Sequence, residues 1–261
     1  MKQSKTIVFI HGLFVNNKSW AAWKTYFEAQ GYTVHTPANP GHDGVPSDLR
    51  ANIHPDLTKT GFEDVVMNIV KLIDTLPEKP IVVGHSLAGL VVLKLIEMGK
   101  AVAGINIDGA PPKNVLAPFS TIKIVYPVVD FFKGQSPFLG SRNWYKRAFF
   151  NNMSEAEAAV AYEEAAVPES RKIARETLLK SFANVDFSKP HQPLLFITGE
   201  QDNIFSPALT KKITSRYKDK NSIVDYKEFK GRSHYIAGQK GWEEVADYVI
   251  NWIENVGKRV G

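Results

Sequence analysis

Residues 80–93 read PIVVGHSLAGLVVL, and this stretch decides the fold class. A short apolar run predicts a buried strand, and residues 86–98 predict a helix that begins directly after it. The strict pattern for a turn that carries a nucleophilic serine is G-x-S-x-G. Here Ala88 stands where the second glycine is expected, and a glycine follows one residue later, at Gly89. Ser86 is therefore either a nucleophile or the N-cap of an ordinary helix.

The turn itself sets a physical requirement that both flanking residues meet. In a sharp strand-to-helix turn, the residues two before and two after the serine must be small, because their backbones pack against each other. Gly84 and Ala88 are both small. The turn alone leaves both interpretations of Ser86 open, and the choice depends on partners elsewhere in the chain.

Strand-like runs alternate with amphipathic helical stretches along most of the chain. This alternation predicts an α/β fold, with a mostly parallel central sheet flanked by helices. The predicted strands cover residues 6–10, 32–36, 81–84, 102–107, 193–199 and 222–229. A helix is predicted over residues 19–30, with Ser19 as its N-cap, and another after a capping box of Thr60 and Glu63.

The alternation stops between residues 110 and 187. We expect a single α/β domain, in which residues 1–109 and 188–261 form the core and residues 110–187 form a helical lid over the carboxyl edge of the sheet. One helix of the lid begins with a capping box of Ser154 and Glu157, and another begins near Val167 or Pro168. The lid is aromatic, and we expect most of its rings to form its own core. For the apolar stretch 122–132, insertion into a membrane interface is the alternative; we favour packing within the lid, because Lys123 and Asp130 interrupt the stretch. Its aromatic residues include Phe131, Phe132, Phe138, Trp144, Phe149 and Phe150.

Composition excludes several classes of site. The chain has 261 residues, 44% of them hydrophobic, with a net charge of +5 and no cysteine. Disulfides, thiolate metal sites and a cysteine nucleophile are therefore excluded. The basic residues between Lys211 and Arg232 alternate with acids, which is typical of a solvated surface rather than a nucleic-acid interface. No apolar run is long enough for a membrane span, and the N-terminal run is too short for a signal peptide. We expect a cytoplasmic protein; a homodimer is left open without support.

A nucleophilic serine needs a base, and the base needs an acid to orient it. His234 lies in FKGRSHYIAG, after the last predicted strand, and Asp202 lies in FITGEQDNIFSP, after the preceding strand. The order serine, aspartate, histidine is that of the α/β-hydrolases. Asp108, which also ends a strand, is an alternative acid.

A developing oxyanion needs backbone N–H donors near the serine. FIHGLF (9–14) places His11 and Gly12 at the end of the first strand, so we expect the amides of Leu13 and Leu87 to be these donors. We expect His11 and His85 to be packed or hydrogen-bonded. We expect His42 and Asp43 to lie in a solvated loop rather than in a metal site.

Five motifs in order, HGLF, PGHDG, GHSLAG, GEQDNIFSP and GRSHY, resemble the α/β-hydrolase superfamily over nearly the whole chain. The resemblance implies Ser86 as nucleophile, His234 as general base and then acid, and Asp202 as its partner. Only five residues precede the first strand, so the two antiparallel strands that usually open the core are missing, as in the plant methylesterase and hydroxynitrile lyase group. In the superfamily's numbering, the lid then follows the sixth core strand.

The expected activity is hydrolysis of a small to medium hydrophobic carboxylic ester or lactone through an acyl-serine intermediate, with no metal or organic cofactor. Phe14 and Trp144 are candidates for substrate contact. The same triad supports lactonase, carbon–carbon hydrolase and hydroxynitrile lyase chemistry, whereas enzymes with an aspartate nucleophile are disfavoured by Ser86. A slow-turnover ligand receptor is the alternative from another class.

Overall fold

A six-stranded parallel sheet forms the centre of the protein, in a computed structural model that describes residues 4–259. The strand order is β2-β1-β3-β4-β5-β6, and every neighbouring pair is parallel. The predicted α/β fold is thus confirmed. The strands are β1 (Thr6–Ile10), β2 (Thr33–His35), β3 (Ile81–His85), β4 (Ala103–Ile107), β5 (Leu194–Gly199) and β6 (Val224–Phe229).

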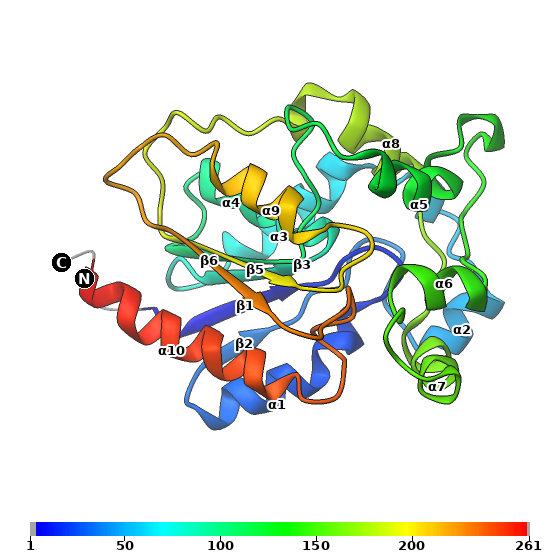
Figure 1. Cartoon of the computed structure of the whole chain (residues 1–261), viewed down its shortest axis with the longest axis horizontal. Coiled ribbons are helices and arrows are strands. Elements are labelled where there is room, and N and C mark those ends of the chain that lie inside the picture. Colours follow the sequence, from blue (N-terminus) through cyan, green and yellow to red (C-terminus); the bar gives the residue numbers. More distant parts are fainter. Residues whose placement is uncertain (1–3, 260–261) are drawn as a thin grey trace.

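Helices cover both faces of the sheet (Figure 1). In β1, Ile7 and Phe9 pack on one face, whereas Val8 and Ile10 pack on the other, as the alternation of side chains along a strand requires. The first face is covered by α1 (Ala21–Ala29) and α10 (Glu243–Arg259). The second is covered by α3 (Phe62–Ile73), α4 (Leu87–Glu97) and α9 (Pro207–Thr214).

Residues 110–187, which we call the insertion, join β4 to β5 without adding a strand to the sheet. The insertion lies to one side of the sheet in Figure 1. It contains α5 (Phe119–Val129), α6 (Arg142–Ala148), α7 (Glu155–Ala165) and α8 (Arg171–Leu179), with short turns η3 (Phe131–Lys133) and η4 (Ser181–Ala183). The capping box at Ser154 and Glu157 opens α7 as predicted.

Three predicted helix starts are wrong. The first helix is preceded by η1 (Asn17–Trp20), where Asn16 rather than Ser19 caps the turn by accepting a bond from the Lys18 N–H. Helix α3 begins one residue late because the Asp64 carboxylate accepts the Gly61 N–H at 2.8 Å. Helix α8 starts after Ser170, because residues 167–170 extend and form a bridge to Phe138 instead. The remaining elements are α2 (Pro46–Ala51) and η2 (Leu57–Lys59).

Among residues 4–259, no helix combines the length and the apolar character that crossing a membrane requires.

Candidate active site

Ser86 lies at the turn between β3 and α4, in a backbone conformation that few L-residues adopt. Its φ is +59° and its ψ is −123°, and the side chain is almost fully buried. A Cβ at position 84 would come within 2.2 Å of the Ala88 carbonyl oxygen, which explains the requirement for a small residue there. A Cβ on Gly89 would lie 2.5 Å from Gly109 Cα, so this glycine allows α4 to pack closely against the segment that follows β4.

A buried chain of hydrogen bonds links Ser86 to His234 and Asp202. The Ser86 hydroxyl lies 3.0 Å from His234 Nε2, and His234 Nδ1 lies 2.7 Å from Asp202 Oδ2. The other carboxylate oxygen accepts backbone N–H groups from Ile204 at 2.6 Å and Phe205 at 3.0 Å. When Asp202 is ionised it has no proton to donate, and His234 then carries its proton on Nδ1 and accepts the serine proton on Nε2.

Burial governs the protonation of this chain. It lowers the pKa of His234 to about 4, so the imidazole is neutral near neutral pH and able to accept a proton. Burial also raises the pKa of Asp202, and the backbone N–H groups of Phe205 and Ile204 oppose that shift. The arrangement is suited to a base that becomes transiently positive beside a fixed acceptor.

The second acid considered from the sequence, Asp108, ends β4 close to the same histidine but binds elsewhere. Its Oδ1 accepts the Gly199 N–H at 2.8 Å, and its Oδ2 lacks a hydrogen-bond partner among the described residues. Burial, helped by the charge of Asp202, raises the pKa of Asp108 well above its ordinary value. Because Asp108 bonds to the backbone of Gly199, whereas Asp202 bonds to His234 Nδ1, Asp202 is the acid placed to orient the imidazole.

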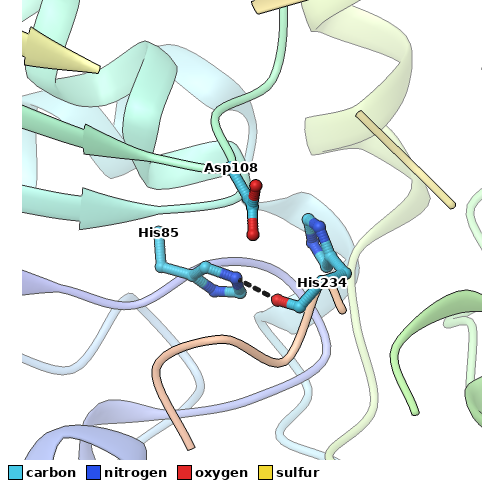
Figure 2. A group of neighbouring side chains, drawn as sticks. All are labelled: His85, Asp108 and His234. Atoms are coloured by element: carbon cyan, nitrogen blue, oxygen red, sulfur yellow. Dashed lines mark hydrogen bonds between the residues drawn. The ribbon is translucent and has the colours of Figure 1, made fainter. Parts of the chain in front are cut away.

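His85, Asp108 and His234 form a compact group whose possible ligand atoms lie within 4.8 Å of one another (Figure 2). The ring nitrogens already have other roles. His85 Nε2 donates to the carbonyl oxygen of His234 at 2.7 Å, and both nitrogens of His234 bind Asp202 and Ser86. Burial lowers the pKa of His85 to about 3, which keeps its ring neutral. Because these nitrogens are already hydrogen-bonded, the group favours proton transfer at His234 over metal binding. His85 supports His234 through its backbone carbonyl.

The loop after β1 approaches Ser86 closely. A Cβ on Gly12 would lie 2.7 Å from Ser86 Cβ, so only glycine fits there without a shift. His11 accepts the Asn39 N–H on Nε2 at 3.0 Å and bonds to the Gly12 carbonyl through Nδ1 at 2.8 Å. Leu87 is the first residue of α4, so its N–H has no acceptor within the helix. The loop carrying Leu13 and the start of α4 therefore lie on either side of the serine.

His42 is not in a solvated loop, contrary to the sequence prediction. It is buried, and its Nε2 lies 3.0 Å from the carboxylate of Glu169, an equally buried residue of the insertion. Although burial opposes it, the Glu169 charge raises the pKa of His42. Glu169 was not identified from the sequence as a partner of His42. An acidic residue just before a helix is common at helix starts, and the two residues lie far apart in the chain.

An almost wholly apolar cavity adjoins the serine. The core lines it with Leu13, Phe14, Ser86, Leu87, Ile204 and Phe205, and the insertion supplies the rest of the wall. Phe14 and Trp144, the two predicted contact residues, both line it, with ring centroids 4.9 Å apart. The other insertion residues along the wall include Thr121, Val125, Val128 and Ala174.

Several solved structures resemble this fold along its length. The chain superposes on a monoacylglycerol lipase of Paleococcus ferrophilus with a TM-score of 0.66 and 20% identity, covering 95% of this chain and 93% of that one. An extracellular alpha/beta-hydrolase from a Paenibacillus species gives 0.70 and 20%, covering 94% and 98%. The methylesterase MES16 of Arabidopsis gives 0.68 and 14%, covering 95% and 98%.

Comparison with curated protein sequences finds no match. The model of the alpha/beta hydrolase family, in contrast, matches residues 7–248, which is nearly the whole chain. That span includes the Ser86 turn and the loops that carry Asp202 and His234. The chain therefore belongs to the alpha/beta hydrolase family and is a hydrolase.

Proposed function

We propose that the protein is a serine hydrolase that cleaves a small to medium hydrophobic carboxylic ester or lactone. The observation that carries this proposal is the hydrogen-bonded chain from Asp202 through His234 to Ser86, which adjoins the apolar cavity. In this role the insertion is a lid, because its helices supply much of the cavity wall. The solved relatives named as a lipase and a methylesterase support the same class of bond.

The proposed reaction has two halves. His234 Nε2 removes the proton from the Ser86 hydroxyl as its oxygen attacks the carbonyl carbon, and the amides of Leu13 and Leu87 stabilise the oxyanion. The imidazolium then protonates the departing alkoxide, which leaves an acyl-Ser86. In the second half His234 activates a water, which releases the carboxylic acid and restores the serine. Asp202 holds the histidine tautomer and stabilises its positive form.

Fluorophosphonate labelling tests this proposal directly. The reagent should attach to Ser86 in the wild type, as located by mass spectrometry, and Ser86→Ala should prevent labelling. Panels of hydrophobic esters and lactones should then show turnover that depends on Ser86. Absence of a label at Ser86 would refute the serine mechanism. Labelling without turnover of any ester or lactone would instead favour carbon–carbon cleavage, cyanohydrin cleavage or a slow ligand receptor.

The cytoplasmic location stays a prediction.

A further inference from the structure

Large apolar side chains are exposed on one part of the insertion. Seven such side chains are more than half exposed among the described residues, and all seven belong to the insertion; six of them come from residues 116–132 and from Leu179, and the seventh is Val160 on α7. Phe132 is 94% exposed and Phe119 is 79% exposed. Packing within the lid, which the sequence suggested for residues 122–132, therefore accounts for only part of that stretch. We call the six the apolar patch: Leu116, Phe119, Tyr126, Phe131, Phe132 and Leu179.

The members of the patch come from neighbouring elements. Helix α5 packs against α8, and the two lie close together in Figure 1. Lys113 Nζ donates to the Leu179 carbonyl at 2.9 Å, and the Arg175 guanidinium lies 5.4 Å from the centre of the Phe131 ring. Phe119 and Tyr126 are seven residues apart on α5, so they lie on the same face of that helix. The exposed side chains thus come from elements that follow one another or pack against one another, rather than from distant parts of the fold.

This surface coincides with the edge of the cavity beside Ser86. Ile122, on the same face of α5, and Leu178, next to Leu179, both line that cavity. They are also 44% and 48% exposed. The wall of the cavity therefore reaches the protein surface beside the apolar patch. A ligand held at the patch would be next to the cavity that adjoins Ser86.

The segments that carry the patch have an excess of basic residues. Residues 110–140 and 171–180 together contain seven basic residues and two acidic ones. Lys123, Lys133 and Lys180 form no ion pair with any residue in the described part of the chain. A second copy of this chain would bring the same cations against each other. An anionic lipid surface complements both the apolar side chains and the lysines.

We propose that the apolar patch docks the protein on an anionic lipid surface, where Lys123, Lys133 and Lys180 contact the headgroups and the exposed aromatic residues insert among the acyl chains. An amphiphilic ester would then pass from the lipid to the cavity between α5 and α8. This second step rests on the proposed esterase function, whereas docking itself does not.

Sedimentation with vesicles tests docking without any chemistry. Ser86→Ala protein is mixed with phosphatidylcholine vesicles or with vesicles that also contain phosphatidylglycerol. We expect stronger binding to the anionic vesicles, weakened by salt. The double variant Phe119→Ser/Phe132→Ser, made in the Ser86→Ala protein, should bind at least about tenfold more weakly. Val160→Ser, at the one other large apolar side chain that is more than half exposed in residues 4–259, should bind as the Ser86→Ala parent does.

The same double change in the active protein separates docking from catalysis. Phe119 and Phe132 do not line the cavity, so hydrolysis of a water-soluble ester should equal that of the wild type. Equal binding to both vesicle types, or unchanged binding by the double variant, would overturn the proposal. So would a stable dimer that binds no vesicles and dissociates in the double variant, because a second copy would then cover the patch. Vesicle binding by a protein that cleaves no ester would refute the esterase and leave docking intact.

Discussion

The carboxylate of Glu169 lies 3.0 Å from His42 Nε2, and both side chains are buried between the insertion and the core. The same carboxylate accepts the Phe14 N–H at 3.3 Å and the Ser170 N–H at 2.6 Å. Phe14 has a φ of +69°, which a side chain of its size rarely adopts, so surrounding contacts must hold it there. Its neighbour Leu13 carries one of the two proposed oxyanion donors. Through Glu169, the insertion therefore holds the backbone of the loop that lies beside Ser86.

The Phe14 carbonyl is held from the same side. It accepts the Val167 N–H at 3.1 Å and the Tyr145 hydroxyl at 2.8 Å. Both backbone groups of Phe14 thus bind residues of the insertion. A change in the insertion that frees Phe14 should relax the left-handed turn and move the Leu13 amide away from the position that an oxyanion would occupy.

Glu169→Gln should lower kcat more than it raises KM. The amide keeps the size of the side chain and can still accept the Phe14 N–H, but it removes the charge that faces His42. We expect kcat to fall by about 10- to 100-fold, since small displacements of catalytic groups have effects of that size. The free energy of unfolding should fall by about 1–3 kcal/mol. Steady-state kinetics and denaturant unfolding measure the two effects.

Glu163→Gln is the matched control for this change. Glu163 is also an acid of the insertion, and it accepts a bond from Arg50 of the core at 2.7 Å, but within residues 4–259 it makes no hydrogen bond to the loop that carries Phe14. Its variant should keep kcat near the wild-type value. If both variants reduced kcat equally, the loss of the charge that faces His42 would not be the cause.

Gly12→Ala should nearly abolish reaction at Ser86. The new methyl group would lie 2.7 Å from Ser86 Cβ and 2.8 Å from the His85 carbonyl oxygen, so the loop must move away. Displacing one oxyanion donor costs on the order of 10²–10³ in kcat. The rate of fluorophosphonate labelling is the measurement. Gly99→Ala, at a φ of +66° and with no atom within 4 Å of the new methyl group, should lower stability but not the labelling rate; equal rates in the two variants would contradict this explanation.

The local sequence pattern predicted the parts of the fold that depend on neighbouring residues. Ser86, Asp202 and His234 each follow a strand-like run, and in a parallel sheet those runs end at one edge. The His42–Glu169 pair was not predictable, because its partners are 127 residues apart and the sequence around Glu169 has no pattern that indicates a partner for His42. Helix α5 was missed as well, since Pro127 lies inside it and its apolar residues point both inward and outward.

The two buried acids should respond very differently to the same change. Asp202→Asn removes the charge that faces His234 Nδ1 and favours the wrong tautomer, so kcat should fall on the order of 10⁴-fold. In Asp108→Asn the side-chain oxygen can still accept the Gly199 N–H, so kcat should fall far less. Both variants need thermal unfolding as a control for stability. A large loss of kcat in folded Asp108→Asn, with activity retained in Asp202→Asn, would reverse the assignment of the acid.

The pH dependence of kcat/KM should show that His234 works as a neutral base. Burial lowers its pKa to about 4, below the ordinary histidine value of 6.5. The neutral form exists above this pKa, so activity should persist at mildly acidic pH and fall as the pH decreases toward 4. His11 and His85 are also buried with pKa values of about 3.

Protonation of these three rings is more favourable in the unfolded chain than in the folded one. Their contribution to stability is therefore complete above pH 6.5 and declines as the pH falls toward 3 to 4. Thermal unfolding at each pH separates that loss from titration of the base. In folded enzyme, a midpoint of kcat/KM at or above 6.5 would show that His234 is not held in the apolar surroundings described here.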